Sequence, residues 1–164
     1  MSDPLATYVH DHLAGAVVAI DLLEALRDQH SDEPLGQFAA GLLVEVEADR
    51  AVLQGLAERV SMGSSRLKEA AAWLGEKVSR VKLGRRAASG LGTFEALEAL
   101  ALGILGKLAL WRALAMIATG DARLGGMDFD HLAARAQAQH AQVEERRLEA
   151  ARKALSGTGV SRAT

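Results

Sequence analysis

Asp49 occupies a position where the surrounding pattern predicts an apolar side chain. It continues a series of residues spaced three and four apart, which places side chains on one face of a helix. The other members are all apolar: Leu42, Val46, Leu53, Leu56 and Val60. A buried carboxylate must be paired, protonated or bound to a cation, because burying the charge alone is strongly unfavourable. We therefore expect Asp49 to have a partner, and we look for chemistry around it.

A small set of polar residues offers that partner. Their level along the predicted helices, counted from the helix ends, places them in one buried polar layer of His12, Asp49, Lys107 and His140, with Arg147 just beyond. The first interpretation is a hydrogen-bonded ion-pair network, in which Asp49 is neutralised by Lys107 or Arg147 and histidine is a neutral linker. Such a network fixes helix register and needs no cofactor.

Two other kinds of chemistry, and an unassigned small-molecule pocket, stay open. Carboxylate and imidazole groups on facing helices are the ligands that iron, manganese or zinc accept, and the candidates are Glu45, Asp49, His140 and Glu144. The nearby cations Lys107 and Arg147 would oppose a further positive charge. Acid–base catalysis by His140 with a carboxylate is the third reading, and no conspicuous serine or threonine nucleophile accompanies it.

The elements that must position these residues are helices. Aspartate or serine caps, proline at the first turn and glycine at the ends predict long helices over about 4–28, 34–61, 93–119 and 129–155, with a shorter one over about 64–84. Asp3 is the predicted cap of the first helix, and Thr93 and Asp128 are the predicted caps of the last two. A short helix between two hairpins returns the chain along a bundle, which makes the second and fourth helices parallel and the first and last antiparallel to them.

Composition supports an all-α chain of one domain. The chain has 164 residues, 49% of them hydrophobic and only 4% aromatic, with two prolines and no cysteine. We expect one helical domain over residues 1–155 and a disordered tail over 156–164. The absence of cysteine excludes disulfides and thiolate metal sites. The first residues have neither the basic start nor the apolar run of a signal peptide, which favours a cytoplasmic protein.

Two segments have unusual composition. The run 99–118 is long enough to span a bilayer, but Lys107 near its middle and Arg112 beyond it argue against a transmembrane segment. The predicted helix around it is apolar nearly all round, which is typical of a central helix or of a subunit contact, here a homodimer.

The second segment is basic. Seven basic residues against two acidic ones give residues 61–92 a charge of +5 within a chain of net charge −2. The candidates for anion or surface binding in this basic segment are Lys77, Arg80, Lys82, Arg85 and Arg86. A solvated face is the more common reading, and nucleic acid is not an expected partner.

This pattern resembles the ferritin-like superfamily over residues 3–155: two antiparallel helix pairs, one crossover, and polar residues facing inward. The stretches 8–15, 47–50 and 103–111 resemble an uncharacterised bacterial helical family, which implies no activity. Di-iron members place one Glu on each of two helices and Glu-x-x-His on each of the other two. Here Glu45 is followed three residues later by Ala48, and His140 is preceded by Gln137 where the Glu belongs.

The combined prediction is an all-α ferritin-like bundle of four long helices with a short crossover helix between the second and third. We expect it to be a non-catalytic structural or interaction module without a cofactor. The alternative is a metal-binding bundle for iron, manganese or zinc.

Overall fold

The computed structural model describes residues 3–61 and 90–156, and these residues form four long helices. The helices are α1 (Pro4–Gln29), α2 (Pro34–Ser61), α4 (Gly90–Ile117) and α5 (Phe129–Leu155), with a short 3₁₀ helix η2 (Ala122–Leu124) before α5. No strand occurs in the described ranges. The all-α prediction is therefore confirmed. The short helix predicted for residues 64–84, the basic residues Lys77 to Arg86, and the tail from residue 157 lie outside the described residues.

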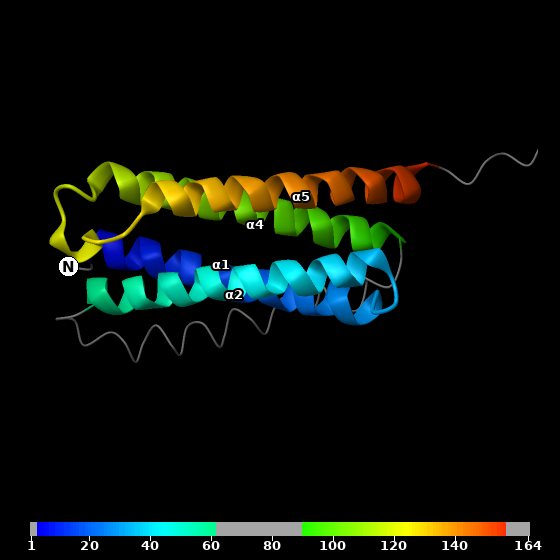
Figure 1. The fold of residues 1–164 in the computed structure, drawn as a ribbon, viewed down its shortest axis with the longest axis horizontal. Coiled ribbons are helices and arrows are strands. Elements are labelled where there is room, and N and C mark those ends of the chain that lie inside the picture. The colour runs from blue at the N-terminus through cyan, green and yellow to red at the C-terminus, as the bar shows by residue number, and fades with distance from the viewer. Residues whose placement is uncertain (1–2, 62–89, 157–164) are drawn as a thin grey trace, which may run out of the picture.

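The helices pack as two antiparallel hairpins laid side by side (Figure 1). Most contacts join α1 to α2 and α4 to α5, and the hairpins meet mainly where α1 packs on α4. In Figure 1, α2 and α4 run in one direction while α1 and α5 run in the other. As a result, α2 ends at the opposite end of the bundle from the start of α4.

Local sequence explains where the helices begin and turn. The Asp3 carboxylate accepts a hydrogen bond from the Leu5 backbone N–H at 2.9 Å, and Asp128 accepts one from His131 N–H at 2.9 Å, so both predicted aspartate caps are confirmed. The turn between α1 and α2 requires glycine at position 36. A Cβ there would lie 1.9 Å from the backbone oxygen of His30. Because that atom belongs to the main chain, rotating a side chain could not remove the clash.

The start of α4 differs from the prediction. The helix begins at Gly90, so Thr93 lies within its first turn and is not the cap. Thr93 is buried, and its Oγ1 lies 3.1 Å from His30 Nε2 at the end of α1. Threonine at this position therefore connects two helices instead of starting one, which a capping rule applied to a single helix could not reveal.

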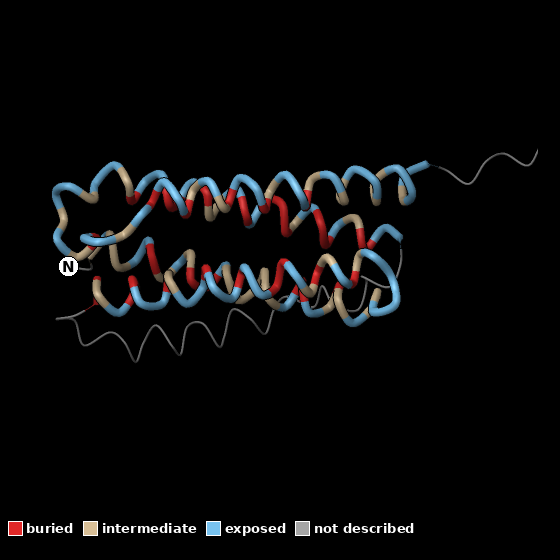
Figure 2. Tube along the Cα trace, in the orientation of Figure 1, coloured by how far each residue is buried: buried red, intermediate tan, exposed pale blue. Residues whose placement is uncertain are grey.

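The core follows the inner faces of all four helices (Figure 2). Its largest fully buried side chain is Trp111 on α4, which packs beside the Phe129 ring at a centroid distance of 6.3 Å.

Of the described helices, α4 alone is long and apolar enough to cross a membrane by length and composition. In its most apolar stretch of 18 residues, 39% are buried in the bundle. Helices in the cores of soluble proteins have the same composition.

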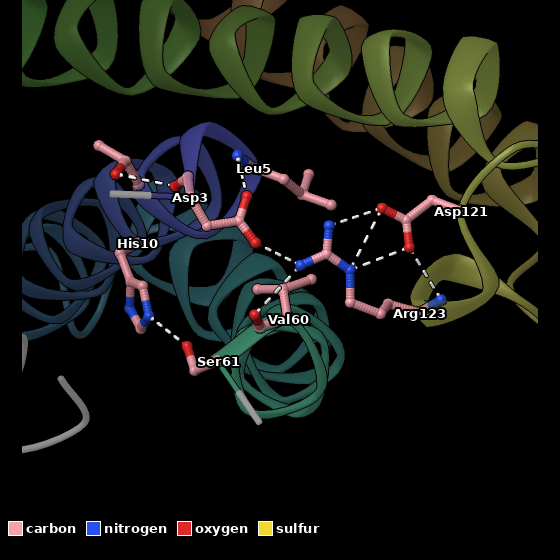
Figure 3. Close-up of polar contacts among 8 residues, drawn as sticks. Asp3, Leu5, His10, Val60, Ser61, Asp121 and Arg123 are labelled. Atoms are coloured by element: carbon pink, nitrogen blue, oxygen red, sulfur yellow. Dashed lines mark hydrogen bonds and ion pairs between the residues drawn. The ribbon is translucent and has the colours of Figure 1, made fainter. Parts of the chain in front are cut away.

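One arginine joins three segments at the end of the bundle where α1 begins (Figure 3). Arg123 of η2 forms ion pairs with Asp3 and, at 2.6 Å, with Asp121. Its guanidinium also donates to the Val60 carbonyl at 3.4 Å, near the end of α2. The hydrogen bonds from Arg123 lower the pKa of both carboxyl groups below the usual 3.8. Arg123 therefore ties the α1–α2 hairpin to the turn that precedes α5.

Replacing Arg123 by Gln should reduce the change of the melting temperature with pH in the acidic range. Because Arg123 lowers the folded-state pKa of two carboxyls, its stabilising effect is complete above pH 3.8 and is lost as the pH falls through the folded-state values. We expect Arg123→Gln to have a lower melting temperature than the wild type at pH 7, with a difference that narrows below pH 4. Thermal unfolding followed by circular dichroism at several pH values measures this.

Arg50→Gln is the matched control, because Arg50 is exposed and has no hydrogen bond or ion pair among residues 3–61 and 90–156. Equal melting temperatures for the wild type and Arg123→Gln at pH 7 would show that the three-segment contact does not stabilise the bundle.

Candidate functional site

Asp49 lies in the interior of the bundle with both carboxylate oxygens engaged. It is 3% exposed. Its Oδ2 accepts hydrogen bonds from Lys107 Nζ of α4 at 2.5 Å and from Gln139 Nε2 of α5 at 3.1 Å. Its Oδ1 forms an ion pair with Arg135, also of α5. Three helices therefore meet at one carboxylate, and Lys107 and Arg135 neutralise its charge.

Gln139 is fully buried and connects the remaining polar groups. Its Oε1 accepts from Lys107 Nζ at 2.5 Å, and its Nε2 donates to Glu45 Oε2 at 3.0 Å as well as to Asp49. Both ends of the amide are used, which fixes its orientation. We call Glu45, Asp49, Lys107, Arg135 and Gln139 the Asp49 cluster. With its four ionisable groups charged, two carboxylates balance two cations.

Burial and pairing act in opposite directions on Lys107. Desolvation lowers the pKa of its ammonium group, and the adjacent Asp49 carboxylate partly offsets this by favouring the charged form. The ammonium group has three N–H donors, of which two are directed to Asp49 and Gln139. The geometry is that of an internal ion-pair network.

Two residues predicted in the polar layer lie elsewhere. Arg147 forms ion pairs with Glu144 at 2.7 Å and with Glu98 at 3.1 Å, so its charge is neutralised between α4 and α5 and not by Asp49. His140 is half-buried, and the residue of α5 that enters the core at this level is its neighbour Gln139. The prediction of His140 for this position was therefore wrong by one residue, although the predicted level was close.

His12 is near the cluster without being bonded to it. It is half-buried on α1, burial lowers the pKa of its imidazole, and its ring packs edge to face against Tyr8 at a centroid distance of 4.7 Å. With Asp49, Lys107 and Trp111 it lines a cavity of about 80 Å³ between α1, α2 and α4. The indole Nε1 of Trp111 is buried and has no hydrogen-bond partner among the described residues.

Among the described residues, Glu45 and Asp49 share the Gln139 amide, but the four candidate metal ligands do not form a group that could hold a metal ion. Glu45 binds the Gln139 amide, Glu144 pairs with Arg147, and Asp49 faces two cations. No group of three histidine or acidic side chains in residues 3–61 and 90–156 has an arrangement that could hold a metal ion. A divalent ion at Asp49 would have to displace Lys107 and Arg135, so these residues as arranged do not fit a metal.

Arg135 and Gln139 are the residues that sequence reasoning missed. The buried positions of α5, which include Leu132, Ala136, Gln139 and Val143, alternate in steps of four and three. That spacing could have identified Gln139. Arg135 lies one turn before Gln139 and reaches the carboxylate with a long side chain, which no helix pattern encodes.

Comparison with protein-family models, with curated proteins and with solved structures found no match for this chain.

Removing the Asp49 carboxylate should destabilise the protein severely. Asp49→Ala leaves the partly buried cations of Lys107 and Arg135 without a counter-charge, and breaking a buried pair in this way costs about 3–5 kcal/mol. Urea denaturation gives the free energy of unfolding. Glu58→Ala on the exposed side of α2 is the control and should change the stability by less than about 0.5 kcal/mol. If Asp49→Ala is as stable as Glu58→Ala, the cluster does not stabilise the fold.

Proposed function

We propose that this chain is a non-catalytic bundle of ferritin-like architecture that serves as a structural or interaction module. The proposal rests chiefly on the Asp49 cluster, whose charges are satisfied inside the protein. Each oxygen of Asp49 and both ends of the Gln139 amide have partners on neighbouring helices. A catalytic carboxylate or lysine must exchange these contacts with a substrate, which here would leave buried charges unpaired.

Helix directions support the ferritin-like architecture. Because α2 and α4 run in the same direction, the chain between Ser61 and Gly90 has to connect opposite ends of the bundle (Figure 1). Two antiparallel helix pairs joined by one long connection are the pattern of the ferritin-like fold. The di-iron ligand pattern is incomplete, since Gln137 precedes His140 and Ala48 follows Glu45. The proposal therefore concerns the architecture and includes no iron chemistry.

An internal network can be replaced by apolar side chains of similar volume, whereas a functional site cannot. We expect Asp49→Leu combined with Lys107→Met to melt close to the wild-type temperature, because the desolvation cost and the pairing of the two charges disappear together, although Gln139 Oε1 then loses its donor. Arg135 has a side chain that is 30% exposed, so it can turn toward solvent. Each single variant should melt well below the double variant. A double variant as unstable as Asp49→Ala would contradict a replaceable network.

Metal titration separates this proposal from the metal-binding alternative. The protein is purified without a histidine tag, analysed for metal content, and titrated with Fe(II), Mn(II) and Zn(II). We expect no stoichiometric binding, because two cations already neutralise Asp49. Stoichiometric binding that Asp49→Ala or His140→Ala abolishes would overturn the structural proposal. Glu58→Ala again serves as the control.

A further inference from the structure

The outer face of α4 carries a continuous stripe of exposed residues with heptad spacing. Its positions repeat every seven residues in two interleaved series, the a and d arrangement of a coiled-coil seam. All eight positions are exposed. In chain order they are Leu91, Glu95, Glu98, Leu102, Leu105, Ala109, Arg112 and Met116.

The apolar members of this stripe are unusually open to solvent. Leu102 is 65% exposed, Leu105 is 42% exposed and Met116 is 82% exposed. Single exposed leucines are common on soluble proteins, but a row that follows one helix face marks a contact surface. The inner face of α4 is fully used by the bundle, where Leu100, Ile104 and Trp111 are buried. The outer stripe is therefore additional to what the core requires.

The stripe is complementary to itself when reversed. Each member has a counterpart equally far from the point between Gly103 and Ile104, which pairs Leu102 with Leu105 at the centre. The same operation pairs Glu95 with Arg112, a negative with a positive charge. The remaining pairs are Leu91 with Met116 and Glu98 with Ala109. Two antiparallel copies would thus bury leucine on leucine and form two ion pairs.

The two charged members are available for such pairing. Glu95 and Arg112 are exposed, and neither has a hydrogen bond or an ion pair with any other residue in the described ranges. Glu98, in contrast, is bound to Arg147 of its own chain at 3.1 Å. On this stripe, the charges that the reversed pairing joins are therefore those without a partner among the described residues.

We propose that α4 pairs with α4 of a second copy of this chain, antiparallel, with a two-fold axis passing between Gly103 and Ile104. This inference rests on the proposed interaction function and specifies its partner. An isologous contact requires one patch that is complementary to itself under a two-fold rotation, which the stripe satisfies. A Cβ at Gly103 would meet no atom within 4 Å, so the helix surface beside the axis is open. The absent side chain there permits close approach of the partner helix.

A membrane is a less suitable partner for the same face. α4 has the length and composition of a spanning helix, but a bilayer gains nothing from opposite charges placed symmetrically about a point. Glu95 and Arg112 would both lose hydration there without gaining a counter-charge. A second copy of the chain supplies that counter-charge.

The association is tested by sedimentation equilibrium of the full chain over a wide concentration range. We expect a species of twice the 17.3 kDa chain mass. Leu102→Glu places a charge beside the two-fold axis and should raise the dissociation constant at least tenfold. Val44→Glu is the matched control, since Val44 on α2 is 66% exposed and lies outside the stripe, and it should leave the constant unchanged. Circular dichroism verifies that both variants are folded.

Charge exchange tests the antiparallel register. Glu95→Arg alone, or Arg112→Glu alone, creates two like-charge pairs across the axis and should weaken association several-fold at low ionic strength. The double exchange restores opposite charges and should restore the wild-type constant. In a parallel pairing each residue would face its own copy, so a single exchange would only replace one like-charge pair by another and would not weaken association.

Cross-linking gives an independent reading, because the natural chain contains no cysteine. A mixture of Leu91→Cys and Met116→Cys proteins should form a disulfide-linked heterodimer under mild oxidation. Leu91→Cys alone should not form a linked dimer, since its two copies would lie at opposite ends of the helix pair.

Four outcomes would overturn the dimer: a monomer at every concentration, a dimer that Leu102→Glu leaves intact, a double exchange that fails to rescue, or a monomer that co-sediments with lipid vesicles through Leu102. None of these affects the Asp49 and Lys107 measurements, which concern one chain. Failure of the dimer and failure of the proposed function are therefore distinguishable.

Discussion

The compensation of one buried negative charge holds the two hairpins of this bundle in register. α2 and α5 meet at few places, and their described interactions are polar or cation–π contacts. Apart from the Asp49 cluster, Arg146 of α5 lies over the Phe38 ring of α2 at 3.7 Å. Apolar packing tolerates small shifts of one helix along another, whereas a carboxylate with three donors accepts very few arrangements. The cluster thus contributes the positional specificity that sparse α2–α5 packing does not.

The Asp49 cluster contains the residue types of an active site, but its charged groups are paired with one another. Buried Asp and Lys side chains within hydrogen-bond distance are also found in catalytic sites. Catalysis additionally requires a group that can give up its partner when a substrate binds. Here Lys107 is held by Asp49 and Gln139, while the adjacent cavity is lined largely by side chains such as Val46, Leu53 and Ile104. The polar groups face one another more than they face open space.

Sequence patterns predicted the level of a residue along the bundle better than the direction in which its side chain leaves the helix. The cap signals at Asp3 and Asp128 show where α1 and α5 begin. Counting residues from the predicted helix ends gave the level of Asp49 on α2, of Lys107 on α4 and of the middle of α5. One residue along a helix rotates the side chain by about 100° and raises it by only about 1.5 Å. A counting error of one residue therefore hardly changes the height but exchanges His140 for Gln139. The reach of Arg135 and Arg147 added a second uncertainty, because a long side chain can find its counter-charge a full turn away.

The rotation of α4 shows how the buried pair and the outer surface depend on each other. This helix is apolar on nearly every side, so hydrophobicity alone does not select which face enters the core. Lys107 does select it, because its ammonium group must reach Asp49 and Gln139 on the neighbouring helices. Once Lys107 faces inward, Ile104 and Trp111, which lie three residues before it and four after it, are buried with it. Leu102, Leu105, Ala109 and Arg112 are then left on the outside. The ion pair that neutralises Asp49 therefore also determines that the heptad stripe of α4 faces away from the core of the described bundle.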